Sequence, residues 1–291
     1  MTRIQTAFSH RPALMPYLTL GYPNIETSLA CIQAAVEAGA DLIELGVPFS
    51  DPLADGPVIQ HSTQVALENG ITTRKCLELV AELRKRGVTI PLILMGYYNP
   101  IYAYGLAAYA REAANAGADG FIVPDLPLEE AADLEAASAE NDLALIPMLA
   151  PTSTPARIEK ATAHANGFMA LPDRARNWSP KSPDFGQNQE ILQSIPVKVG
   201  RAGFIYLVSV TGVTGARSEM ATGLKEFVGR VKESARVPVA VGFGISTPAQ
   251  AAEVGKIADG VIIGSAVIKA ASGERPVEGV RDFIRSIHAA L

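Results

Sequence analysis

Residues 41–57 read DLIELGVPFSDPLADGP, an apolar run that opens into a loop rich in proline and acidic side chains. Glu44 stands inside the apolar run, and Asp51 and Asp55 follow in the loop. Burying a carboxylate is costly, so an acid on an apolar strand has either a partner or a chemical task. A salt bridge for Glu44 and turn or capping roles for the two aspartates are the plainer interpretation. The rest of the chain favours the chemical one.

The same kind of short apolar run recurs along the chain, and helical patterns separate the runs. Runs that are apolar on both faces are typical of parallel strands covered by helices. Thr154-Pro155 and Thr247-Pro248 predict helix starts, and Gly39 and Gly117 predict helix ends. The expected strands are Tyr17–Leu20, Leu42–Leu45, Leu92–Met95, Gly120–Val123, Leu143–Ile146, Gly203–Val208, Val237–Val241 and Gly260–Ile263.

Strand–helix units of this number and size predict a (β/α)8 barrel, the TIM barrel, as a single domain over residues 1–291. A doubly wound open sheet is the alternative, but the first strand is not followed by the Gly-rich turn of that fold. The active site of a barrel lies at the C-terminal ends of its strands. The loops that follow the strands therefore hold the candidate residues.

Composition narrows the class of protein. Hydrophobic residues make up 48% of the chain and charged residues 19%, which indicates a globular protein. The net charge of −5 offers no basic surface for nucleic acid, although backbone N–H groups could still bind a small anion. The two cysteines and four histidines have neither disulfide nor metal-ligand spacing, so we expect buried thiols and no metal site. With no secretion signal in residues 1–10 and no membrane-length apolar run, we expect a cytoplasmic protein.

Glycines follow the last strands, where barrels commonly bind phosphate. Gly242-Phe243-Gly244 follows the seventh strand, and Gly264-Ser265 follows the eighth. Glycine lets the backbone approach an anion closely, and N–H groups at a helix start donate to it. Gly215, after the sixth strand, could add another N–H donor. The alternative is that these glycines only make the tight turns that any barrel needs.

Four longer motifs resemble the tryptophan synthase alpha subunit family: ELGVPFSDPLADGPVIQ (44–60), VPDLPLEE (123–130), LVSVTGVTGAR (207–217) and VGFGIS (241–246). The resemblance runs from the N-terminus to about Phe168 and from about Gly203 to the C-terminus. It implies a TIM barrel that cleaves indole-3-glycerol phosphate into indole and glyceraldehyde 3-phosphate by a retro-aldol reaction, without metal or organic cofactor. It also implies a beta subunit partner in an alpha2beta2 complex, and pyridoxal phosphate is expected only in that partner.

The resemblance also implies roles for individual residues. Glu44 matches the acid that protonates the indole ring and handles the proton of the glycerol hydroxyl, and Asp55 matches the carboxylate that binds the indole N–H. Desolvation of Glu44 would raise its pKa towards the working pH, while Asp55 on a more polar loop could stay ionised. Other matches are Tyr17, Ile122 and Tyr206 around the indole, Gly215, Gly244, Gly264 and Ser265 at the phosphate, and Asp51, Pro52 and Asn99 at the partner interface.

A Pro-rich stretch at 169–204 departs from the family pattern and is predicted to be an insert before the sixth strand. Two similar strand starts, at Phe168 and Phe204, compete for one place in the barrel. We choose the second because Tyr206 and the Gly-rich loop follow it. The insert would then lie on the N-terminal face, opposite the active site. A loop excursion, a partner-binding loop and translated non-coding sequence remain open for it.

Four tyrosines, at positions 97, 98, 102 and 104, follow the third strand. Packing is the first interpretation of this cluster, and a partner surface is the second. For the chain as a whole, two alternatives to the lyase remain. One is a folded but weakly active alpha subunit impaired by the insert, and the other is a different phosphate-binding barrel enzyme.

Overall fold

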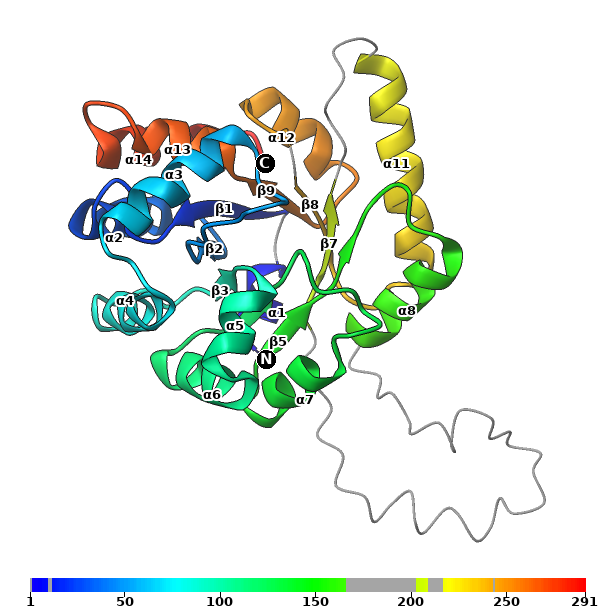
Figure 1. Cartoon of the computed structure of the whole chain (residues 1–291). Coiled ribbons are helices and arrows are strands. Elements are labelled where there is room, and N and C mark those ends of the chain that lie inside the picture. Colours follow the sequence, from blue (N-terminus) through cyan, green and yellow to red (C-terminus); the bar gives the residue numbers. More distant parts are fainter. Residues whose placement is uncertain (1, 10–11, 166–202, 209–216, 243) are drawn as a thin grey trace, which may run out of the picture.

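The computed structural model describes residues 2–9, 12–165, 203–208, 217–242 and 244–291. In this part of the chain, parallel strands form one sheet in the order β5-β4-β3-β2-β1-β9-β8-β7-β6, with helices around the outside (Figure 1). The strands are β1 (Ala13–Thr19), β2 (Ile43–Gly46), β3 (Leu92–Met95), β4 (Gly120–Ile122), β5 (Ala144–Ile146), β6 (Met148–Leu149), β7 (Ile205–Val208), β8 (Val239–Gly242) and β9 (Gly260–Ile263).

The two ends of this sheet are joined through a single residue, Pro147. Strand β5 pairs with β4 and strand β6 pairs with β7, so one continuous stretch of chain closes the sheet into a barrel. β5 lies within the predicted fifth strand, Leu143–Ile146, and β6 follows beyond its predicted end. Pro147 has no N–H to donate, but its carbonyl accepts the N–H of Tyr206 at 3.0 Å. The predicted TIM barrel is confirmed.

The described helices are α1 (Arg3–Ala7), α2 (Ile25–Glu37), α3 (Pro57–Glu68), α4 (Thr73–Lys85), α5 (Tyr98–Tyr104), α6 (Leu106–Ala116), α7 (Ala132–Glu140), α8 (Pro155–Ala165), α11 (Arg217–Ser234), α12 (Pro248–Gly255), α13 (Ser265–Ala271) and α14 (Pro276–His288). The starts predicted at Thr154-Pro155 and Thr247-Pro248 are confirmed, the latter as a capping box with Gln250. Gly117 ends α6 in the left-handed conformation. None of these helices combines the length and hydrophobicity needed to cross a bilayer.

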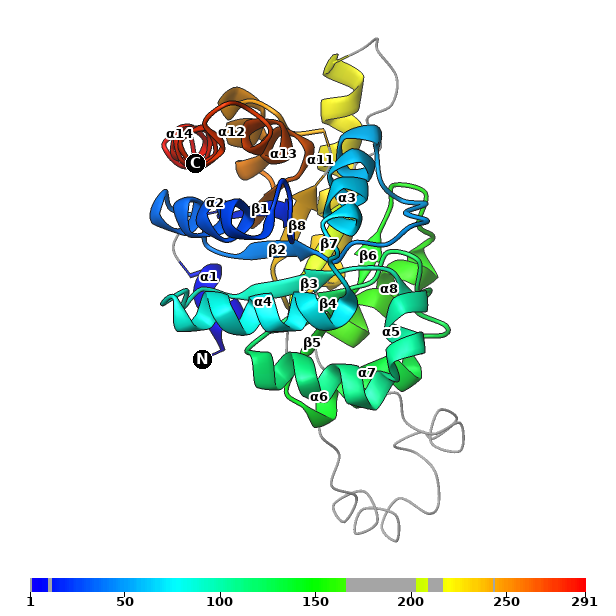
Figure 2. The ribbon, with the colours of Figure 1, turned by 60° about the vertical axis from the view of Figure 1, so that its left-hand side comes forward.

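Alternation along the strands divides the apolar side chains into two cores. One set points into the barrel and forms an inner core that includes Met15, Ile93, Ile122 and Ile262. The other set points outward and packs under the helices. The last helix, α14, lies against α2 and so covers the seam where β1 pairs with β9 (Figure 2).

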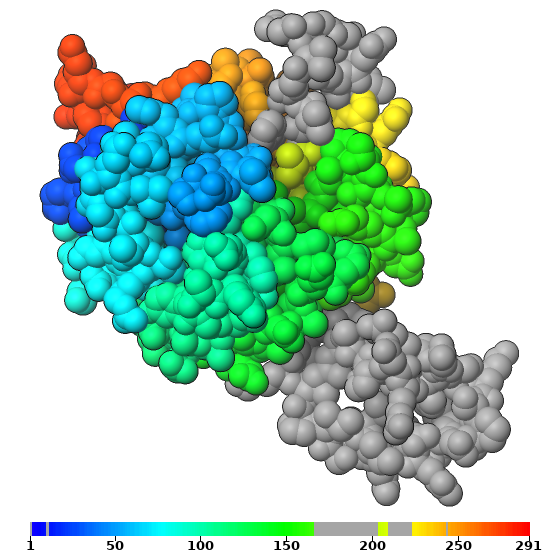
Figure 3. Space-filling view, in the orientation of Figure 1, coloured from blue at the N-terminus to red at the C-terminus, as the bar shows by residue number. Residues whose placement is uncertain are grey.

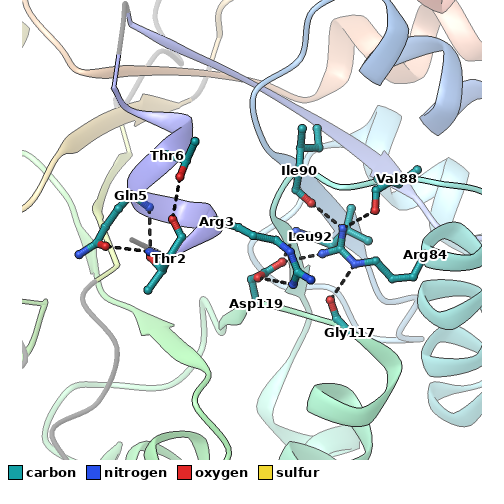
Figure 4. A network of polar contacts seen from close by, with 10 residues as sticks. All are labelled: Thr2, Arg3, Gln5, Thr6, Arg84, Val88, Ile90, Leu92, Gly117 and Asp119. Carbon is teal, nitrogen blue, oxygen red and sulfur yellow. Dashed lines mark hydrogen bonds and ion pairs between the residues drawn. The ribbon is translucent and has the colours of Figure 1, made fainter.

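Helix α1 closes the N-terminal end of the barrel. Ile4 of α1 is buried in the inner core, and Phe8 packs on Phe204 with ring centroids 5.5 Å apart. Beside it, the buried carboxylate of Asp119 accepts hydrogen bonds from Arg3 and Arg84 (Figure 4). This end of the molecule is therefore filled by side chains and their ion pairs.

Most of the predicted insert, residues 169–202, lies outside the described residues. Its predicted last residue, Phe204, is fully buried in the inner core and directly precedes β7. Phe204 therefore belongs to the core of the barrel. The competing strand start at Phe168 also lies outside the described residues, whereas Ile205–Val208 forms β7 and pairs with both β6 and β8.

Candidate active site

The candidate side chains of β1 and β2 reach one cavity because they stand at positions of their strands that face the inside of the barrel. Tyr17 and Glu44 are paired neighbours across β1 and β2. Tyr206 occupies an inward position of β7, on the other side of the barrel. All three line a cavity of about 1210 Å³, together with Asp55 from the loop after β2. The sequence-predicted acids and tyrosines are therefore brought together.

Glu44 is buried without compensation. Its side chain is 1% exposed, and its Oε1 is the one buried side-chain polar atom in the described part of the chain that has no hydrogen-bond partner. Burial raises the pKa of Glu44 to about 8, because the apolar surroundings disfavour the charged form. A carboxyl group with this pKa carries a proton at neutral pH and can give it up to a substrate.

Asp55 is held by a tyrosine from the next strand end. The hydroxyl of Tyr97 donates to Asp55 Oδ2 at 3.0 Å, and the same hydroxyl accepts the backbone N–H of Ala54 at 3.0 Å. Burial raises the pKa of Asp55, and the hydrogen bond from Tyr97 opposes this by stabilising the carboxylate. The sequence pattern did not reveal this contact, since the two residues belong to different loops.

Two glycines leave the space that the rings of the two cavity tyrosines occupy. A Cβ atom on Gly46 would overlap the hydroxyl of Tyr17, and one on Gly242 would overlap the hydroxyl of Tyr206. Each ring therefore lies across the neighbouring strand at a point where only glycine leaves room. Burial raises the pKa of both tyrosines, and the charges of Glu44 and Asp55 raise it further. Both hydroxyls stay protonated beside the acids and can donate hydrogen bonds.

The glycine-rich loops after β8 and β9 border the same cavity. Gly244, Gly264 and Ser265, which the sequence predicted as phosphate contacts, all line it. Gly244 has φ +76°, a left-handed conformation that strongly favours glycine. Lys269, four residues after Ser265 and thus on the same side of α13, also lines the cavity, and no sequence pattern singled it out. Gly215, the fourth predicted phosphate contact, lies outside the described residues.

The apolar wall next to the acids differs from the expected one. Ile122 is fully buried in the inner core, and the residue that lines the cavity here is Pro124, in the turn after β4 and two positions further along. The wall at this point is therefore formed by the loop beyond the C-terminal end of β4 and not by the strand itself. Ile59, Met95, Met148 and Ile262 complete the apolar lining.

Polar residues that the sequence did not indicate line the cavity on the side of α8. Arg157 and Lys160 both reach Glu129, at 3.9 and 3.5 Å. The two cations are therefore already paired in this structure. Lys269 has no such ion pair among the described residues, which leaves its charge available near the glycine loops.

The predicted interface residues lie outside the cavity. Asp51 and Asn99 are exposed, and Pro52 is half-buried beside them. The segments that contain them, near residue 50 and near residue 100, meet on the face shown in Figure 3. The same two segments carry the large hydrophobic side chains that are most exposed in the described residues, Leu53 at 91% and Tyr102 at 66%.

Chemically, the cavity offers an acid that is protonated at neutral pH, a second carboxylate held in place, two protonated phenols and glycine-rich loops along its wall. Such a set suits proton transfer to an apolar ring that carries a phosphorylated chain. Within the described residues, no three His, Cys, Asp or Glu side chains come together as a metal-ligand set.

Comparisons with known proteins agree with this geometry. The model of the family described as "Tryptophan synthase alpha chain" matches residues 4–175 and 187–286. The chain is 44% identical over 291 residues to the tryptophan synthase alpha chain of Dehalococcoides mccartyi, covering 100% of both, and 45% identical over 299 residues to that of Chloroflexus aggregans, covering 100% and 98%.

Solved structures give the same result. Tryptophan synthase subunit alpha from Legionella pneumophila superposes with a TM-score of 0.80 at 32% identity, covering 100% of this chain and 98% of that one. A structure of Mycobacterium tuberculosis tryptophan synthase superposes with a TM-score of 0.76 at 37% identity, covering 99% and 94%. The chain therefore belongs to the tryptophan synthase alpha chain family.

Proposed function

We propose that this cavity performs the retro-aldol cleavage of indole-3-glycerol phosphate, with Glu44 as the proton donor and Asp55 as the carboxylate that binds the indole N–H. As a member of its family, the chain is a lyase of tryptophan biosynthesis. The observation that carries the residue roles is the buried Glu44, unpartnered at Oε1, in one cavity with Asp55 and the glycine loops. The volume of about 1210 Å³ accommodates an indole ring and a phosphorylated chain together.

Glu44 alone can carry out both proton transfers of the reaction. Its carboxyl group gives a proton to the ring carbon that carries the glycerol chain, and the ring nitrogen takes up positive charge. Asp55 stabilises this charge through the indole N–H. The Glu44 carboxylate then removes the proton of the adjacent glycerol hydroxyl, the carbon–carbon bond breaks, and its electron pair returns to the ring. Indole and an aldehyde leave, and Glu44 is protonated again.

The glycine loops place the substrate for this step. Backbone N–H groups near Gly244, Gly264 and Ser265 would bind the phosphate, and Lys269 would add a compensating charge. Holding the phosphate fixes the chain so that its reacting carbon lies at Glu44. The step requires no metal or organic cofactor, and pyridoxal phosphate belongs to the expected partner subunit.

A beta subunit is the proposed partner, in an alpha2beta2 assembly. Exposed apolar side chains such as Leu53 and Tyr102 are typical of an interface core. They lie on the segments that also hold Asp51, Pro52 and Asn99, and the first of these segments leads directly into Asp55. Docking there would order the loop that carries the second carboxylate.

The test is an assay of indole release from indole-3-glycerol phosphate by the full chain, with and without a beta subunit. We expect slow release by the chain alone and faster release in the complex, with co-elution on size-exclusion chromatography at micromolar concentration. Tyr102→Ser should weaken co-elution, whereas Tyr109→Phe, at a buried tyrosine of α6, should not. No indole under either condition would rule out the proposed reaction.

The phosphate end is tested separately. Inorganic phosphate should raise the melting temperature of the parent chain, because a ligand of the native state stabilises it by mass action. Gly244→Val places a branched side chain in a left-handed conformation at the proposed anion site. It should abolish this protection and raise KM for the substrate, and equal protection of both proteins would place the phosphate elsewhere.

A further inference from the structure

Tyr97 lies two residues beyond the end of β3 and immediately before α5, yet its hydroxyl contacts the loop after β2. It donates to Asp55 Oδ2 and accepts the N–H of Ala54, both at 3.0 Å. Among the described residues, the Asp55 carboxylate accepts one hydrogen bond, and it comes from the Tyr97 hydroxyl. Ala54 itself is exposed, so the loop has little packing of its own at this point.

The ring of Tyr97 is well fixed. The side chain is 5% exposed and packs against Phe49 with ring centroids 5.5 Å apart. The backbone on either side is anchored, since Gly96 donates to the carbonyl of Ile122 and Tyr98 donates to the Asp125 carboxylate at 2.9 Å. The hydroxyl therefore comes from an anchored position after β3 and reaches the more exposed loop after β2, as expected of a group that sets another group's position.

We propose that Tyr97 is a positioning residue that holds the Asp55 carboxylate in place and in its ionised form for the proposed lyase reaction. The assignment rests on the proposed role of Asp55. A hydroxyl that donates to a carboxylate stabilises the charged form, and a charge-assisted hydrogen bond is stronger than a neutral one. Without it, burial alone would act on Asp55 and favour the protonated acid, which cannot accept the indole N–H in the same way.

Other titratable groups face this pair, and their effects differ from that of Tyr97. Tyr17, Glu44 and Tyr206 come from β1, β2 and β7, and Asp125 comes from the loop after β4 and faces Tyr97. The two other tyrosines stay protonated, and a charge on Glu44 would disfavour a charge on Asp55. The hydrogen bond of Tyr97 is thus the contact on this side of the cavity that favours the Asp55 carboxylate.

The experiment compares Tyr97→Phe with Tyr98→Phe in the full chain. Each variant loses one phenolic oxygen at adjacent positions, but no hydrogen bond of the Tyr98 hydroxyl occurs within the described residues. Tyr97→Phe should lower kcat by roughly ten- to hundredfold, the effect of one hydrogen bond to a charged group. The acidic limb of its pH–rate profile should move to higher pH, while the alkaline limb, set by Glu44, should stay. Tyr98→Phe should match the parent in both.

A titration that needs no turnover separates this proposal from the proposed function. With 13C-labelled aspartate, the Asp55 carboxyl signal, assigned by its loss in Asp55→Asn, should titrate at higher pH in Tyr97→Phe than in the parent. In addition, Tyr97→Phe should have no further effect on kcat in an Asp55→Asn background, because it acts through that carboxylate. An unchanged Asp55 titration in folded Tyr97→Phe overturns the proposal, whether or not the chain releases indole.

Discussion

Glu44 and Asp119 are two buried carboxylates that lie at opposite ends of the barrel, 1% and 2% exposed. Asp119 precedes β4 at the N-terminal end and accepts hydrogen bonds from Arg3, Arg84 and the Leu92 N–H, at 3.0, 2.7 and 2.9 Å (Figure 4). Glu44 faces the cavity at the C-terminal end, and its Oε1 has no partner among the described residues. The same chemical group is thus satisfied at one end and left unsatisfied at the other.

The difference shows what each end of the barrel is for. Burying a charge is unfavourable unless hydrogen bonds and opposite charges replace the lost water. At Asp119 they do, so this carboxylate can tie α1, α4 and the start of β3 together. At Glu44 they do not, and the cost appears as a pKa raised to about 8. An acid of that kind is a poor element of stability and a good proton donor.

The largest expected effect is on turnover. Glu44→Gln keeps the size of the side chain but cannot transfer the proton, so indole release should fall by roughly 10²–10⁴-fold with KM little changed. Stability at neutral pH should be equal to or above that of the parent. The matched control is Glu129→Gln, a cavity acid that pairs with Arg157 and Lys160 instead of facing the reacting carbon. If both variants lose activity equally, Glu44 has no special role.

The next effect is on stability. Asp119→Asn removes the negative charge that faces two guanidinium groups and leaves that of Arg84 half-buried without it, so unfolding free energy should fall by about 3–5 kcal/mol. Indole release by the folded protein should stay near the parental value. Urea denaturation measures the loss, and Asp133→Asn, at an exposed position of α7, provides the control. A marked loss of kcat with little loss of stability would contradict the division between the two ends.

Sequence reasoning found one of these two carboxylates and not the other. Glu44 could be predicted because a charge inside an apolar run is a local anomaly. Strands such as β3 and β9 were predicted with their observed bounds because a continuous apolar run is also a local pattern. Strand β1 begins at Ala13, four residues before the predicted start, because Pro16 interrupts the apolar pattern without interrupting the strand.

Local sequence patterns could not show which residues become hydrogen-bond partners of one another. Arg3 and Asp119 are 116 residues apart, and Tyr97 and Asp55 are 42 apart, so their contacts exist only once the barrel has closed. The absence of a partner for Glu44 Oε1 is equally non-local, since it depends on every element around the cavity. The displacement of the cavity wall from Ile122 to Pro124 is a shift from the strand to the turn that follows it, and the depth of the cavity decides this.

The third prediction concerns the pH dependence of stability. The pKa of Glu44 is about 8 in the folded protein and near its ordinary 4.5 in the unfolded chain. Between these values the folded state holds a proton that the unfolded state has lost, so raising the pH favours unfolding. Relative to Glu44→Gln, the parent should lose a few kcal/mol of stability, in order of magnitude, between pH 5 and pH 8. Parallel curves of unfolding free energy against pH would show that Glu44 is not buried as a protonated acid.

The smallest expected effect concerns the ion pairs of Asp119 at the N-terminal end of the barrel. The side chain of Arg3 is 50% exposed and makes one bond to Asp119, whereas that of Arg84 is 15% exposed and also donates to the carbonyls of Gly117, Val88 and Ile90. Arg3→Ala should therefore cost only about 1 kcal/mol of unfolding free energy, the scale of a solvent-screened ion pair, and the loss should shrink at high salt. Arg84→Ala should cost clearly more and depend less on salt, because its contacts are shielded from solvent. Equal losses for the two would mean that the guanidinium groups act as one unit around Asp119, with α1 as integral to the base of the barrel as α4.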